Sequence, residues 1–194
     1  DDLPVVGTQS TYLTGHDEIH SLSQILKIPT IRFWMGFGEH YINVFSVLKS
    51  LGLLSEQPVQ LDSGQEVVPL QLVKAVLPDP ASLAPDYTGK TCIGTLLKGE
   101  KDGKPREVFL YNVCDHAETY AEIGSQAISY TAGVPAAAAA LLIADGTWDV
   151  QRMVNVEELP PLPLLWLQAG MGLPTRVREG TTDMALEDAP EAQD

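Results

Sequence analysis

The sequence predicts an α/β (α+β) fold in which helices cover one β-sheet. Helical and strand-like segments alternate through its first half, which suggests layers of both kinds. Two β-type runs then flank an Asp-Gly pair, the strongest short-range signal of a hairpin. A long alanine-rich segment with high helix propensity follows them. With 194 residues, of which 44% are apolar and 20% charged, the chain can bury a substantial core.

The first third reads as two strands and two helices. Residues 3–14 are extended, and the apolar spacing after Gly15 predicts a helix that ends near Pro29. Thr14, followed three residues later by Asp17, resembles a capping box for this helix. Residues 30–37 then predict a buried strand. A second amphipathic helix follows, with Gly52 as its C-terminal stop. We expect this helix over Glu39–Leu51.

The middle of the chain predicts a helix, a loop and the hairpin. Pro69 is suited to the first turn of a helix that runs to about Leu77, and residues 78–85 have the composition of a loop. The hairpin strands are predicted at Thr91–Leu97 and Glu107–Cys114, with the turn at Asp102-Gly103.

The two cysteines of the chain are placed by this hairpin. A simple register sets Cys92 opposite Val113, so that Cys92 and Cys114 lie on opposite faces of the sheet. The sequence therefore predicts two free thiols and favours a reducing, cytoplasmic environment.

The last third predicts a loop over residues 115–124 and a long helix from Ser125, which Pro135 should kink or restart. A last strand is expected at Met153–Val156, and a short helix over residues 164–172. Residues 178–194 are acidic and poor in large apolar side chains, and we expect them to be disordered.

The charge distribution limits the partners. The net charge is -14, and no basic stripe is present, so nucleic acid is an improbable ligand. The longest apolar run, Val134 to Ala144, is shorter than the ~20 residues of a membrane span. We therefore expect neither a nucleic-acid nor a membrane partner.

Two short motifs resemble known sites without matching them. His16 and His20 lie one helical turn apart, but Asp17 stands where a zinc-protease helix has glutamate. No metal site is predicted, although a metallohydrolase built on this HDEIH segment remains an alternative. The pair Gly36 and Gly38 lacks the third glycine of a dinucleotide loop, since Tyr41 occupies that position.

Two cations are candidates to bind a substrate carboxylate. Arg32 lies between apolar residues of the predicted buried strand, where a guanidinium requires a carboxylate, either from the chain or from a ligand. Lys74 lies in an apolar helix, where it either extends its ammonium group to solvent or faces a ligand.

Residues 113–135, VCDHAETYAEIGSQAISYTAGVP, combine polar, small and aromatic residues where a core element would show a clean apolar period. Loops after strand ends often carry sites. We expect substrate contacts from Glu118, Gln126 and Tyr130, and His116 is a candidate for proton transfer. Tyr12 and His16 are candidates for the same role, since no short motif identifies the proton-transfer residue.

Five segments together resemble the carboxynorspermidine dehydrogenase (carboxynorspermidine synthase) branch of the saccharopine dehydrogenase family. They occur in the family's order and comprise residues 31–54, 67–83, 89–104, 111–139 and 155–177. The resemblance extends from about Leu3 to Val177. The segment LPPLPLL departs from it, because acids are expected between these prolines.

The resemblance implies an NADPH-dependent oxidoreductase that joins aspartate semialdehyde to a diamine, either diaminopropane or putrescine, in polyamine biosynthesis. The implied fold is an open mixed sheet covered by helices, similar to the catalytic domain of glyceraldehyde-3-phosphate dehydrogenases, in a homodimer. The N-terminal Rossmann domain of the family is absent from this sequence. Residues 1–177 are then the substrate-binding and dimerisation domain, of which residues 148–177 could dock on the cofactor domain. The alternatives are a saccharopine dehydrogenase and a catalytically silent dimerisation or binding module.

Overall fold

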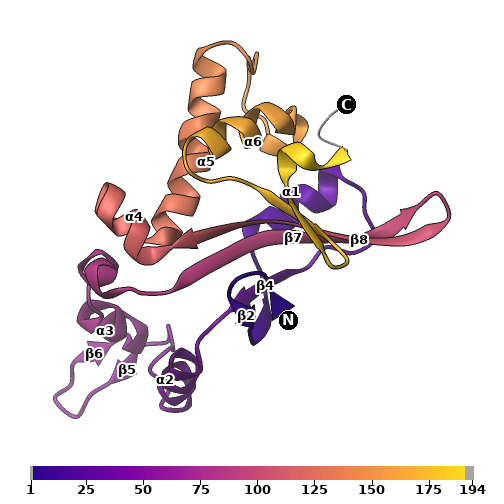
Figure 1. The fold of residues 1–194 in the computed structure, drawn as a ribbon. Helices are drawn as coiled ribbons and strands as arrows, with labels where there is room; N and C mark the ends of the chain where they lie inside the picture. The colour runs from indigo at the N-terminus through magenta and orange to yellow at the C-terminus, as the bar shows by residue number, and fades with distance from the viewer. Residues whose placement is uncertain (1, 191–194) are drawn as a thin grey trace.

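The computed structural model describes residues 2–190. Its helices and strands alternate along the chain as the sequence predicts for an α+β protein (Figure 1). The strands are β1 (Asp2–Leu3), β2 (Gly7–Thr8), β3 (Thr11–Thr14), β4 (Phe33–Gly36), β5 (Val59–Gln60), β6 (Glu66–Val67), β7 (Lys90–Lys101), β8 (Lys104–Asp115), β9 (Arg176–Glu179) and β10 (Thr182–Ala185). The α-helices are α1 (Asp17–Ile25), α2 (Glu39–Ser50), α3 (Pro69–Val76), α4 (His116–Ile123), α5 (Ala127–Ala144) and α6 (Pro161–Gly170), and the short 3-10 helices are η1 (Pro80–Asp86), η2 (Val156–Glu158) and η3 (Leu186–Asp188).

The β7–β8 hairpin confirms the sequence prediction down to its register. Asp102 and Gly103 both have positive φ, 54° and 73°, as a type I′ turn requires. Cys92 pairs with Val113, so the two thiols lie on opposite faces and both are free. The prediction of an unbridged pair is therefore confirmed.

The main sheet has four strands in the order β10-β9-β8-β7, and every neighbouring pair is antiparallel. The other described sheets are two-stranded and also antiparallel. The expected mixed sheet is therefore wrong for residues 2–190. Tight turns join β7 to β8 and β9 to β10, and after α4, α5 and α6 the chain returns as β9 antiparallel to β8. Helices α5 and α6 cover one side of the main sheet (Figure 1).

The core lies between this sheet and these helices. One cluster joins Cys114 of β8 to Ala127, Tyr130 and Val134 of α5, together with Leu173. A second cluster of buried residues contains Val177, Leu186 and Ala189. In the second cluster, Val108 and Leu110 occupy alternate positions of β8 and therefore lie on the same face of the sheet.

The C-terminal segment corrects the prediction of disorder from residue 178. Residues 178–190 complete β9 and form β10 and η3, while residues 191–194 lie outside the described part. Arg106 binds Glu179 through two hydrogen bonds of 2.6 and 2.8 Å, and Arg176 binds Asp183 at 2.8 Å. Two acids of this segment, Glu179 and Asp183, are thus paired with cations of the sheet. The strand expected at Met153–Val156 is also wrong, since only the last of these residues enters a helix, η2.

Residues 115–124 form α4 instead of the predicted loop. The Asp115 side chain accepts hydrogen bonds from the backbone N–H groups of Ala117 and Glu118, and Gly124 ends the helix with a φ of 67°. These are a standard N-cap and a glycine C-terminal stop. The Asp115 cap and the terminal Gly124 thus stabilise helix α4 although its sequence is polar.

Helix α5 continues through Pro135 without the predicted restart. A proline inside a helix removes one backbone hydrogen bond and crowds the preceding turn. Buried side chains at four-residue intervals lie on both sides of it, at Tyr130, Val134, Ala138 and Leu142. The buried face of the helix thus continues across the proline.

Helix α5 is long and apolar enough to cross a membrane by length and composition alone, and it is the one such helix among the described residues. The apolar run counted in the sequence began at Val134 and is therefore shorter than this helix, which begins at Ala127. In this structure 28% of α5 is buried, and its buried residues include Tyr130 and Val134, which pack in the cluster with Cys114 of β8.

The N-terminal part differs from the rest because no residue from 2 to 68 is buried. The predicted strand at residues 30–37 is present as β4, but it is not buried, and Trp34 is 49% exposed. The predicted capping box is also wrong. His16 occupies the N-cap of α1 and makes no side-chain capping bond.

Candidate active-site groove

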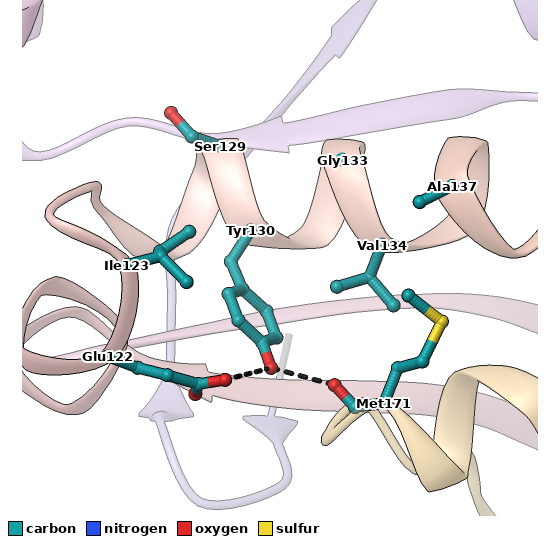
Figure 2. A pocket seen from close by; sticks show the side chains of 8 residues that line it. All are labelled: Glu122, Ile123, Ser129, Tyr130, Gly133, Val134, Ala137 and Met171. Carbon is teal, nitrogen blue, oxygen red and sulfur yellow. Dashed lines mark hydrogen bonds between the residues drawn. The ribbon is translucent and has the colours of Figure 1, made fainter.

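A groove of about 250 Å³ lies between α4, α5 and the segment after α6 (Figure 2). Its apolar lining comes from Ile123, Gly133, Val134, Ala137 and Met171, and its polar groups are Glu122, Ser129 and Tyr130. Figure 2 shows the Glu122 carboxylate beside the Tyr130 hydroxyl, opposite the Met171 main chain. The groove is therefore mainly apolar, with one carboxylate at one end.

Tyr130 forms the polar centre of the groove. Its side chain is 6% exposed, and its hydroxyl donates to the Met171 carbonyl at 2.8 Å. The Glu122 Oε1 atom lies 3.4 Å from the same hydroxyl. A phenol has one proton to donate, and the shorter contact with Met171 takes it. Glu122 thus keeps acceptor capacity for another donor.

Burial and the neighbouring Glu122 carboxylate both raise the pKa of Tyr130, burial being the larger cause. The neutral phenol is the form that donates to Met171. The raised pKa therefore keeps this donor in place well into alkaline pH.

Gly172 makes room for the Tyr130 hydroxyl. A Cβ atom at this position would lie 2.6 Å from the hydroxyl oxygen, and the residue has a φ of 87°. Both the space and the backbone conformation therefore favour glycine.

Further acids surround the α4 end of the groove. Burial raises the pKa of the Cys114 thiol, and the charges of Asp115, Glu118 and Glu122 raise it further. Glu118 and Glu122 lie one turn apart on α4, the spacing at which helical side chains are neighbours. The local field is therefore negative and favours a cationic ligand.

His116 is buried, with 8% of its surface exposed, and takes part in the packing of α5. Its Nδ1 atom accepts a hydrogen bond from the backbone N–H of Ala127 at 3.3 Å, and its ring stacks on Tyr87. An accepting Nδ1 carries no proton, so the ring is the neutral Nε2–H tautomer. This nitrogen is occupied by the start of α5 and cannot take a proton from a substrate in this conformation.

Gln126 is the N-cap residue of α5, and its Oε1 atom is buried without a hydrogen-bond partner among the described residues. A buried amide oxygen normally finds a donor. The structure thus brings four predicted residues, His116, Glu118, Gln126 and Tyr130, to the α4–α5 junction.

The other four predicted residues lie elsewhere. Tyr12 and His16 belong to β3 and the start of α1, Arg32 precedes β4, and Lys74 is on α3; all four are exposed. The prediction of a buried Arg32 is wrong, because nothing in residues 2–190 covers the β3–β4 hairpin enough to bury its residues. No described hydrogen bond or ion pair links these four side chains to the groove.

The two histidines of the HDEIH segment contact neighbouring side chains of the chain itself. The His16 Nδ1 atom contacts the Glu18 carboxylate, and its ring stacks on Phe33 at 4.1 Å. His20 contacts the Gln24 side chain. Over residues 2–190 no group of three histidine, cysteine or acidic side chains could hold a metal ion.

Sequence reasoning missed Glu122 and Met171 as groove residues. Glu122 would have been found by reading residues 116–123 as a helix, since the capping Asp115 and the terminal Gly124 are both visible in the sequence. Met171 follows Tyr130 by 41 residues and contributes a backbone carbonyl, for which no side-chain signal exists.

Comparison with known proteins places the chain. Residues 2–169 match the saccharopine dehydrogenase C-terminal domain. The chain is 47% identical over 178 residues to proteins named carboxynorspermidine synthase from Vibrio alginolyticus and Vibrio cholerae. It is 49% identical over 174 residues to carboxyaminopropylagmatine dehydrogenase from Synechocystis sp..

These alignments cover 92% of the chain for the Vibrio proteins and 88% for the Synechocystis protein. The chain spans 43% of the length of each of these relatives. On this evidence the chain belongs to the saccharopine dehydrogenase family, of which it contains the C-terminal domain.

Proposed function

We propose that this chain is the C-terminal, substrate-binding part of an NADPH-dependent oxidoreductase of polyamine biosynthesis. The reaction condenses the aldehyde of aspartate semialdehyde with a primary amine, and a hydride from the cofactor reduces the resulting imine. A separate Rossmann-type domain supplies NADPH, and residues 148–177 dock on it. The complete enzyme is a cytoplasmic homodimer that acts on small molecules, without nucleic-acid or membrane partners.

The printed names of the relatives support this reaction class. Two relatives are synthases of carboxynorspermidine, and the third is a dehydrogenase of carboxyaminopropylagmatine. Each named compound combines a carboxyl group with a cationic alkylamine. The substrate site of this chain must accordingly accept one anionic and one cationic partner.

The observation that carries the proposal is the Glu122 carboxylate at the end of the apolar groove. A diamine has methylene groups between two cationic ends, so it needs an apolar channel and a carboxylate. Ile123, Val134 and Met171 provide the channel. Glu122 retains acceptor capacity because Tyr130 donates to Met171. Glu118 and Gln126 complete the amine side of the site.

The carboxylate of the semialdehyde requires a cation. Arg32 and Lys74 are both exposed, and neither makes a described ion pair within residues 2–190. A guanidinium can bind a carboxylate through two hydrogen bonds, which makes Arg32 the better candidate. Because both lie outside the groove, the proposal requires the complete enzyme to bring one of them near the aldehyde.

The group that transfers the proton remains one of three predicted residues. His116 can transfer a proton only if its Nδ1 atom releases the Ala127 N–H, because the neutral ring otherwise holds its one proton on Nε2. Tyr12 and His16 are exposed near the β3–β4 hairpin, on the same part of the chain as Arg32. If Tyr12 or His16 transfers the proton, we therefore expect Arg32 to bind the semialdehyde carboxylate.

The test uses the full-length enzyme with aspartate semialdehyde and diaminopropane, putrescine or agmatine, followed by NADPH oxidation. Glu122→Gln should raise the KM for the amine by about tenfold or more, since a charged hydrogen bond contributes roughly 1.5–3 kcal/mol. The KM for the semialdehyde should stay the same. Glu107→Gln, which alters an exposed carboxylate paired with Lys98, is the control. An unchanged amine KM in a folded Glu122→Gln enzyme would remove the groove from the site.

A further inference from the structure

We propose that Gly133 determines which amine the groove accepts, because its missing side chain leaves room for a long alkylamine that ends in a guanidinium, such as agmatine. The inference rests on the proposed function of the groove and deepens it. It assigns the chemical class of the amine and the residue that selects it.

Gly133 has no structural reason to be glycine. It lies inside helix α5, where glycine is a poor helix former, and its φ is not positive. A Cβ atom at this position would meet no atom within 4 Å outside its own helix. The local fold would therefore tolerate a side chain here, in contrast to Gly172. A ligand that lies across the position explains the glycine.

The position of Gly133 in the groove fits such a ligand. Ser129, Gly133 and Ala137 recur every four residues along α5, and all three line the groove (Figure 2). Residues at this spacing lie on one side of a helix, so the three form a continuous floor of small side chains. Gly133 is the middle of this floor, and an alkyl chain that follows α5 must pass over it.

The length of the floor favours a long amine. Ala137 lies seven residues beyond Tyr130, which at a rise of about 1.5 Å per residue is about 10 Å. Bond lengths of about 1.5 Å and tetrahedral angles give about 5 Å between the terminal nitrogens of extended diaminopropane, about 6 Å for putrescine and about 9 Å for agmatine. Agmatine therefore covers nearly the whole distance from the Tyr130 end to Ala137.

The volume of the groove agrees with this length. The groove measures about 250 Å³, and one water molecule takes up about 30 Å³ in the liquid. The groove thus has room for about eight non-hydrogen atoms. Agmatine has nine such atoms, whereas putrescine has six and diaminopropane has five. A short diamine would leave part of the groove to water.

Glu122 is suited to a guanidinium at its end of the groove. Its Oε1 atom lies 3.4 Å from the Tyr130 hydroxyl, whose proton goes to the Met171 carbonyl. Both carboxylate oxygens can therefore accept from a ligand. A guanidinium donates two parallel hydrogen bonds to a carboxylate, whereas an ammonium group acts as a point charge.

Steady-state kinetics of the full-length enzyme test the proposal, with aspartate semialdehyde, NADPH and one amine at a time. The wild-type kcat/KM should be higher for agmatine than for diaminopropane. Gly133→Val should lower kcat/KM for agmatine by about tenfold or more relative to diaminopropane, since a misfit of one methylene group changes discrimination by about 10- to 200-fold. Diaminohexane has the length of agmatine without the guanidinium, and it should lose as much as agmatine does.

Two further variants make the test decisive. Ala132→Val places the same side chain at an exposed position of α5 outside the groove lining, and the ratio between the amines should stay the same. Ala137→Val, at the far end of the floor, should weaken agmatine more than putrescine, and it replaces Gly133→Val if that variant fails to fold. A wild-type preference for diaminopropane would overturn the proposal. Equal losses for all amines in the folded groove variants would overturn it as well.

Failure of the proposed function would give a different result. In that case the wild-type enzyme oxidises NADPH with none of these amines, or Glu122→Gln leaves the KM for every amine unchanged, and both proposals fall. Turnover that depends on Glu122 but shows no dependence on amine length in Gly133→Val would overturn the role of Gly133 alone.

Discussion

The Tyr130 hydroxyl donates to the Met171 carbonyl at 2.8 Å and thereby ties α5 to the segment that follows α6. Tyr130→Phe removes this donor and leaves the carbonyl without it. We expect a loss of about 1 kcal/mol in the free energy of unfolding, the usual net contribution of a hydrogen bond. Urea denaturation measures the difference. Tyr120→Phe, at a more exposed position on α4, should change stability little, and equal losses in both variants would contradict this role for Tyr130.

Gly172→Ala should destabilise the fold more than Gly124→Ala. Both glycines have positive φ, 87° and 67°, where an L-residue costs about 1–2 kcal/mol. At Gly172 the new methyl group also meets the Tyr130 hydroxyl at 2.6 Å, whereas Gly124 faces open space. The excess should shrink in a Tyr130→Phe background, which the four variants of a double-mutant cycle can measure. If Gly172→Ala remains more destabilising than Gly124→Ala by the same amount in the Tyr130→Phe background, contact with the Tyr130 hydroxyl is not the cause.

Gly94→Ala should destabilise the central hairpin, although Gly94 does not have positive φ. A Cβ atom there would approach the Leu110 carbonyl oxygen and lie 2.6 Å from the Tyr111 Cβ atom. Overpacking of this kind costs about 1–3 kcal/mol, and a backbone neighbour cannot move aside easily. Gly99→Ala on the same strand has open space at its Cβ position and is the matched control. In thermal unfolding, Gly94→Ala should have a clearly lower Tm than Gly99→Ala.

The Asp115 cap should make stability depend on acid pH. Backbone N–H groups of α4 and the nearby Lys90 lower the pKa of this carboxyl group below its ordinary value, with the Glu118 N–H as the largest cause. A lowered pKa in the folded state means that the carboxylate stabilises the fold above the unfolded pKa of about 3.9. This stabilisation is lost as the pH falls through the folded value.

Asp115→Ala should therefore be less stable than wild type at neutral pH, and the difference should narrow below about pH 4. Asp115→Asn keeps a side-chain oxygen that can cap the helix but does not titrate. Its free energy of unfolding should therefore lack the pH dependence that the Asp115 carboxylate contributes. Unfolding curves between pH 3 and pH 7 test both variants. Asp149→Ala, at an exposed loop carboxylate that accepts from the Gln151 amide, serves as the control. A pH-independent deficit in Asp115→Ala would rule out the charge as the stabilising element.

Sequence patterns predicted the parts of the fold that local chemistry decides. Asp102-Gly103 identified the hairpin and its register because two consecutive residues with positive φ admit few alternatives. Pro69 likewise marked the start of α3. Helix α4 was missed because its polar composition outweighed its two end signals. The order of residues 178–190 was missed because it depends on cations from other strands, such as Arg106.

The candidate site was predicted in outline only. Residues 113–135 do supply most of the groove, including Tyr130 and Glu122. The wall formed by Met171 depends on packing between distant segments, which no spacing rule reveals. The burial of Arg32 was inferred from apolar neighbours, and that inference fails where no other element covers the strand.

The absence of buried side chains between residues 2 and 68 has a consequence for the local motions of the chain. Amide protons exchange through local openings, whose free energy is small where few apolar contacts must break. Those of α2 should therefore exchange with solvent much sooner than those of β8 and α5.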